Sequence, residues 1–114
     1  IKLPLSAFLS ITHRVSGILI FFLVLPLSVM VFSELTHSQD SFDNFMHSYN
    51  SNLGIKLGCI GLMLIFQYHI FTGIRHMLMD FHILNESLSS SFKSAVVTLI
   101  LFVVNTLLTF WVMI

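Results

Sequence analysis

The chain has 114 residues, of which 56% are hydrophobic and only 9% are charged, and its formal net charge is zero. A soluble domain carries roughly 25% charged residues, so this composition fits a lipid solvent better than water. Zero net charge provides no basic field for nucleic acid, and the single cysteine, Cys59, can form no internal disulfide. The length suits one domain, which we place over residues 1–114.

Three segments contain no Asp, Glu, Lys or Arg: Val15–Ser33, Leu57–Ile74 and Ser94–Ile114. Each is close to the ~20 residues that cross the hydrocarbon layer as a helix, and lipid forces backbone groups to be satisfied within each segment. The first is too long for a signal-peptide core. The sequence therefore predicts an all-α membrane protein, an up-down-up bundle of three transmembrane helices at about 7–33, 52–80 and 91–114. Pro26 should kink the first helix modestly.

The charged residues predict the orientation of these spans. The N-terminal side and the second connection (85–93) carry the basic residues Lys2, Arg14, Arg75 and Lys93 on or near one face. The first connection (35–52), which is polar, is mainly acidic in its charge. Cytoplasmic loops carry the excess of Lys and Arg, so we expect a cytoplasmic N-terminus in a bacterial inner membrane. The matrix side of the mitochondrial inner membrane is the alternative.

The second predicted helix carries one stripe of glycines and polar residues. At 100° per residue the stripe contains these members: Gly54, Gly58, Gly61, Ile65, His69, Gly73, His76 and Asp80. Its first three glycines have the spacing that lets another helix approach closely. Gly73 lies one turn from His69, and we expect it to leave room for a bulky group there.

His69 is the deepest ionisable residue of this stripe. It lies eleven residues before Asp80, roughly 16 Å along a helix axis. An ionisable group at such a depth is costly and marks a functional site by default, although a neutral histidine bonded to a neighbouring helix remains an alternative. A zinc ion would require three or four nearby ligands, and this chain has no second deep histidine. A haem iron ligated by His69, with its other ligand from a partner chain, fits better.

The first helix places polar residues at the matching end. Ser10, Arg14 and Gly17 share one of its faces, with His13 alongside, and Arg14 lies on the side of the membrane where Arg75 occurs. From His69 to Arg75 is six residues, roughly 9 Å, which is about the reach from a haem iron to its propionates. Guanidinium groups suit these carboxylates, so we expect the propionates near His13, Arg14 or Arg75.

The remaining singled-out residues have simpler interpretations. We expect His37, His47 and His82 to be solvated and Trp111 to lie in the interfacial aromatic belt. Asn105, inside the third span, should bond to a neighbouring helix.

Two motifs resemble those of a known family. "SITHRVSG" (10–17) and "YHIFTGIRHMLMDF" (68–81) are similar to the two signatures of the cytochrome b anchor subunit of succinate dehydrogenase (respiratory complex II), the larger of its two small anchors. The family patterns are approximately S-x-x-H-R-x-[ST]-G and H-x-x-x-G-x-R-H-x-x-x-D, and both are complete here. With its three spans, the chain resembles the family over essentially its whole length.

The resemblance implies a role for each matching residue. His69 would be an axial ligand of haem b, with the second axial histidine in the other small anchor subunit. Ser10 and Arg14 would line a ubiquinone site formed with the iron–sulfur subunit. The residues expected at the haem propionates or edge are His13, Arg14, Arg75 and His76. Gly17, Gly73 and Asp80 would be structural.

The implied reaction divides between subunits. FAD and the iron–sulfur clusters belong to the flavoprotein and iron–sulfur partners, and electrons would pass from them to ubiquinone in this enzyme complex. Ser10 can hydrogen-bond a quinone carbonyl, while Arg14 stabilises developing negative charge but cannot supply protons. Protons would come through water or a partner residue. Two alternatives stay open: a haem-free structural anchor of the fumarate reductase type, and a small membrane transporter.

Overall fold

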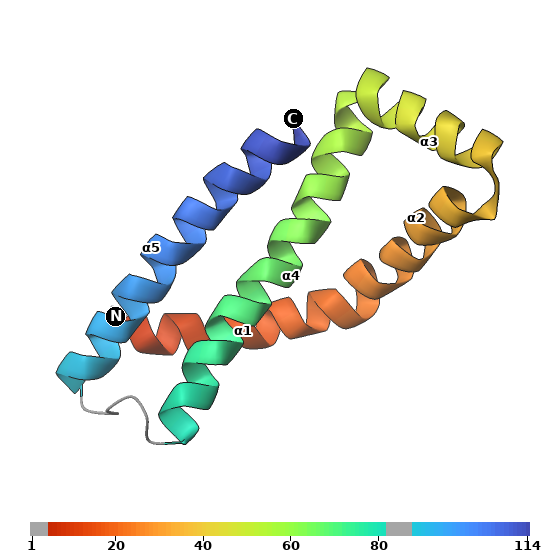
Figure 1. Ribbon diagram of the computed structural model, residues 1–114. Coiled ribbons are helices and arrows are strands. Elements are labelled where there is room, and N and C mark those ends of the chain that lie inside the picture. The colour runs from red at the N-terminus through yellow and green to blue at the C-terminus, as the bar shows by residue number, and fades with distance from the viewer. Residues whose placement is uncertain (1–4, 82–87) are drawn as a thin grey trace.

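The computed structural model describes residues 5–81 and 88–114, and over these residues it is helical with no strand (Figure 1). The elements are α1 (Leu5–Leu19), the π-helix η1 (Ile20–Val24), α2 (Leu25–His37), α3 (Gln39–Ser51), α4 (Leu53–Asp80) and α5 (Leu88–Met113). Lys2, His82 and part of the predicted second connection lie outside the described residues.

Three helices are long and apolar enough to cross a membrane: Ala7–His37, Leu53–Asp80 and Ser90–Met113. They confirm the predicted all-α class with three spans. The first span includes α1, η1 and α2 and extends beyond the predicted end at residue 33. Figure 1 shows α4 and α5 running side by side, while α1 crosses α4 and α2 then diverges from it.

Pro26 is accommodated by a π-helical segment directly before α2. Proline has no N–H to donate, and its ring would clash with the carbonyl group four residues earlier in a regular helix. The helix instead forms wider π-helical turns over Ile20–Val24, where the N–H of Leu25 donates to the carbonyl oxygen of Ile20. Such π segments occur where an α-helix must absorb a local irregularity.

The first connection contains a helix that the sequence interpretation missed. Ser38 begins α3 with a capping box: its Oγ accepts from the N–H of Ser41 at 3.1 Å, and its own N–H donates to Ser41 Oγ at 3.1 Å. Tyr49 then donates from its hydroxyl to the carbonyl oxygen of Met113 at 2.7 Å, which ties α3 to the end of α5. The missed signal was the helical spacing of Phe42, Phe45 and Tyr49 within a polar stretch.

The interior of the described bundle is small and partly polar. Its buried hydrophobic residues are Leu9, Val24, Ile60 and Ala95, and its buried polar residues are Ser16, Thr72, Arg75, Ser91, Thr98 and Thr109. Large apolar side chains such as Phe22 and Trp111 are exposed at 72% and 85%. Asn105 donates to Gln67 Oε1 at 2.7 Å, which confirms its predicted bond to a neighbouring helix. This distribution suits a chain whose outer surface meets lipid or other apolar helices.

Candidate functional site

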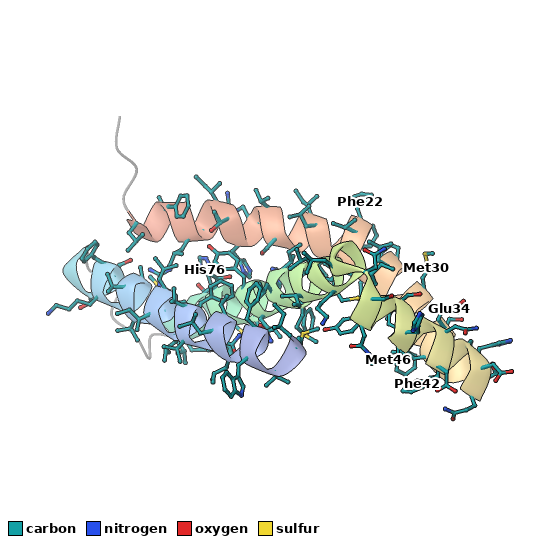
Figure 2. The ribbon with its side chains drawn as sticks, turned by 90° about the horizontal axis from the view of Figure 1, so that it is seen from above. Phe22, Met30, Glu34, Phe42, Met46 and His76 are labelled. Atoms are coloured by element: carbon teal, nitrogen blue, oxygen red, sulfur yellow. The ribbon has the colours of Figure 1, made fainter. Side chains whose placement is uncertain are left out.

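Histidines from α1 and α4 meet where these two helices cross. The rings of His13 and His69 stack with centroids 4.1 Å apart and planes 10° from parallel. His76 lies between α1 and α4 in Figure 2, with its ring centroid 5.2 Å from that of His13. The crossing therefore brings His13 together with two histidines of α4 that stand far from it along the chain.

Ser16 determines which nitrogen of His69 carries hydrogen. The Ser16 hydroxyl donates its single hydrogen to the carbonyl oxygen of His13 at 2.7 Å, because a carbonyl can only accept. Its oxygen is also 2.9 Å from His69 Nδ1 and must accept there. His69 thus carries its hydrogen on Nδ1 when neutral, and Nε2 keeps a lone pair. A histidine that ligates a metal normally donates its other ring N–H in this way.

Thr72 imposes the same tautomer on His13. The Thr72 hydroxyl donates within α4 to the carbonyl oxygen of Tyr68 at 2.9 Å. It lies 2.7 Å from His13 Nδ1, so that nitrogen is the donor. Thr12 and Tyr68 add a further hydroxyl bond between α1 and α4. Each helix thereby orients a histidine of the other.

Close helix approach occurs at two glycines that face these rings. A Cβ atom on Gly17 would lie 3.2 Å from His69 Cε1, and a Cβ on Gly73 would lie 3.2 Å from His13 Cε1. The room expected at Gly73 is therefore filled by His13. Gly58 and Gly61 have no neighbour within 4 Å in this chain, so the expectation that they let another helix approach closely stays a prediction.

Ser10 and His76 form a second contact between α1 and α4. The Ser10 Oγ atom is 3.2 Å from His76 Nε2. Ser10 was predicted at the quinone and His76 at the haem edge, whereas the structure places their polar atoms together. Arg14 is exposed one turn beyond Ser10, and Asp80 is exposed at the last residue of α4.

Arg75 is oriented toward α5. Its side chain is 3% exposed, its Nε donates to Ser94 Oγ at 3.1 Å, and its Nη2 donates to the Ser91 carbonyl and hydroxyl oxygens at 3.1 Å. These bonds link α4 to α5, so Arg75 has a structural role that the sequence did not suggest. Its predicted position at a haem propionate stays a prediction.

The donor set suits a group that takes one ligand from this chain. Among residues 5–81 and 88–114, no cluster of three or more His, Cys, Asp or Glu side chains could hold a metal ion. His69 lies within the second span, and its Nδ1 atom is engaged by Ser16, so its Nε2 atom is the one suited to a ligand. His13 stacks on His69 from within the first span, so the expectation of no second histidine at this depth was wrong. Ser16 and Thr72, which the sequence interpretation did not single out, are the residues that set these tautomers.

Comparison with known proteins places this chain in a family. The family model for the succinate dehydrogenase/fumarate reductase transmembrane subunit matches residues 1–109. The chain belongs to this family. It is also similar to the succinate dehydrogenase cytochrome b556 subunit of Coxiella burnetii, with 38% identity over 77 residues. That match covers 68% of this chain and 61% of the relative, so it spans less than two thirds of the relative's length.

Membership of the transmembrane-subunit family agrees with the three apolar spans. Both predicted motifs lie inside the matched residues 1–109. The chain is a membrane protein.

Proposed function

We propose that this chain is the membrane anchor of a succinate:quinone oxidoreductase, in which His69 supplies one axial ligand of haem b. Ser10 and Arg14 contribute to a ubiquinone-reduction site. FAD and iron–sulfur clusters reside in partner subunits, and a second small anchor supplies the other axial histidine. The complex lies in the inner membrane with the N-terminus of this chain on the cytoplasmic side.

One observation carries the haem assignment. The Ser16 hydroxyl accepts from His69 Nδ1 because its own hydrogen is engaged by the carbonyl oxygen of His13. The lone pair on His69 Nε2 is then the one available to iron, and the acceptor behind the ring raises the basicity of that nitrogen.

Bound haem supplies one-electron transfer at a potential set by its ligands and surroundings. The residues of this chain bind and orient it. His69 Nε2 would hold the metal, Ser16 would fix the rotation of the His69 ring, and His13 would restrict its tilt by stacking at 4.1 Å. Arg14 is exposed and free to reach anionic oxygens at the inner end of α1.

Ser10 and Arg14 lie one turn apart near the start of the first span. The Ser10 hydroxyl can donate to a quinone carbonyl oxygen. The Arg14 guanidinium can stabilise the negative charge that develops on the same substrate as electrons arrive. Their place near the end of the span suits a substrate that enters from the bilayer and receives electrons from a subunit at the surface.

The haem assignment is tested on the whole purified complex by a reduced-minus-oxidised absorption spectrum. We expect the wild-type complex to show a b-type signal and His69→Ala to lose it, because the iron loses an axial ligand. His47→Ala, on the exposed side of α3, is the matched control and should keep the full signal. An unchanged signal in His69→Ala would exclude His69 as ligand. No signal in the wild type would favour a haem-free anchor.

A further inference from the structure

We propose that His76 supplies a proton, through Ser10, to a carbonyl oxygen of the quinone. This inference rests on the proposed quinone site. Reduction of a quinone to a quinol consumes two electrons and two protons, and Arg14 cannot supply protons because a guanidinium does not deprotonate in proteins. The chain must therefore offer another donor if it takes part in the proton transfer.

The contact that carries the proposal is the pairing of Ser10 Oγ with His76 Nε2 at 3.2 Å. A hydroxyl can accept one hydrogen and donate another at the same time, so it can pass a proton from a donor behind it to an acceptor in front. Histidine is the side chain that exchanges a proton most readily near neutral pH. Ser10 and His76 thus form a two-residue chain that ends at the predicted substrate.

The transfer balances as follows in atoms and charge. The Nε2–H bond of the His76 imidazolium breaks as a new O–H bond forms on Ser10. The original Ser10 O–H bond breaks as an O–H bond forms on the quinone oxygen. The electrons come from an iron–sulfur cluster of a partner subunit, and the second proton reaches the other carbonyl oxygen from outside this pair. His76 is left neutral and is protonated again before the next turnover.

The position of His76 near the end of α4 allows it to be protonated again after each transfer. It lies four residues before Asp80, the exposed last residue of α4, and thus about 6 Å from the end of the helix at 1.5 Å per residue. The titratable and charged groups around it are His13 and Arg14 on α1 and Arg75 and Asp80 on α4. The Nδ1 atoms of the stacked His13 and His69 rings contact Thr72 and Ser16, whereas His76 is the histidine whose ring nitrogen contacts Ser10.

The sign of the pH dependence follows from the protonated donor. Only the imidazolium form of His76 carries the proton to be transferred. The rate of quinone reduction should therefore be highest below the pKa of His76 and should fall as the pH rises through it.

The test measures succinate-driven quinone reduction and dye reduction by the whole complex across a range of pH. We expect His76→Gln to slow quinone reduction by at least about tenfold, since general acid catalysis contributes typically 10²–10⁴-fold, and to remove the alkaline fall. Dye reduction should not change. His47→Gln is the matched control and should keep both the rate and the pH profile. Ser10→Thr, which keeps a hydroxyl, should retain more activity than Ser10→Ala.

The outcomes separate this proposal from the quinone site itself. Normal quinone reduction in His76→Gln, or a slow rate with the alkaline fall intact, would overturn the proton role of His76. If Ser10→Ala and Arg14→Leu still depress quinone reduction selectively, the quinone site stands without the relay. If these two variants also leave quinone reduction unchanged, the proposed quinone site itself fails.

Discussion

At the scale of single residues, two hydroxyl groups decide the chemistry of two histidines. Ser16 and Thr72 each donate their one hydrogen to a backbone carbonyl oxygen, so each oxygen can only accept from a histidine. The bonds at 2.9 Å and 2.7 Å then place hydrogen on the Nδ1 atoms of His69 and His13. In the proposed haem site, Ser16 would thus control which ring nitrogen of His69 faces the metal.

Ser16 offers a direct test at this scale. Ser16→Ala removes the acceptor for His69 Nδ1–H, so we expect haem affinity to fall roughly 10–100-fold, as is typical when a residue that orients a ligand is lost. Transfer of haem to an apo-globin measures the affinity, and the low-spin ferric resonance spectrum should broaden as the ring rotates. Ser16→Thr should restore both. Ser51→Ala, an exposed hydroxyl on α3, is the control; identical behaviour of Ser16→Ala and this control would exclude the orienting role.

At the scale of elements, α1 and α4 pack closely because a histidine ring of each helix lies against a glycine of the other. Gly17 of α1 lies under His69 of α4, and Gly73 of α4 lies under His13 of α1. A side chain at either glycine would separate the helices and shift a histidine. The glycine positions are thus part of the site, although neither residue contributes a polar atom to it.

Two glycines of α4 provide a matched comparison. A Cβ on Gly73 would stand 3.2 Å from His13 Cε1, whereas one on Gly58 would meet nothing within 4 Å. We expect Gly73→Ala to destabilise the protein by about 1–3 kcal/mol through overpacking. Within this chain, Gly58→Ala should be neutral or stabilising by up to about 1 kcal/mol, because alanine favours a helix over glycine. Melting temperatures of the two variants in detergent make the comparison, and equal loss in both would contradict it.

At the scale of the whole molecule, α3 connects the start of the second span with the end of the third. Tyr49 donates to Met113, near the end of α5, where the last carbonyl groups of a helix lack partners within it. The Lys56 ammonium group of α4 lies 5.3 Å from the centre of the same ring. Burial raises the pKa of Tyr49 above its usual value, so its hydroxyl keeps the hydrogen that it donates.

Tyr49→Phe tests this connection. The change removes one hydrogen bond but keeps the ring, so we expect a loss of about 1 kcal/mol in the free energy of unfolding. Thermal unfolding in detergent measures the loss, with His47→Gln on the same helix as the control. The haem spectrum should not change, because Tyr49 lies on α3 and not at the histidine crossing. A melting temperature equal to that of the control variant would show that the bond contributes nothing.

The sequence by itself determined the all-α class, the number of spans and the candidacy of His69. These properties are local: hydropathy sets each span, and helical rise converts residue spacing into depth. The helix α3 was missed because its few regularly spaced apolar residues lie among many polar ones. The π segment was missed because a proline in the sequence does not specify how the helix around it changes.

Only the tertiary structure decided what each polar side chain touches. Ser16 and His69 are 53 residues apart, and Ser10 and His76 are 66 apart. Whether such groups meet depends on where two helices cross and how each is rotated about its axis, and a change of one residue in register turns a helix by about 100°. The sequence therefore indicated the same polar residues but paired them differently. It placed Gly73 beside His69 and Arg75 near Arg14, whereas in the structure Gly73 lies against His13 and Arg75 bonds to α5.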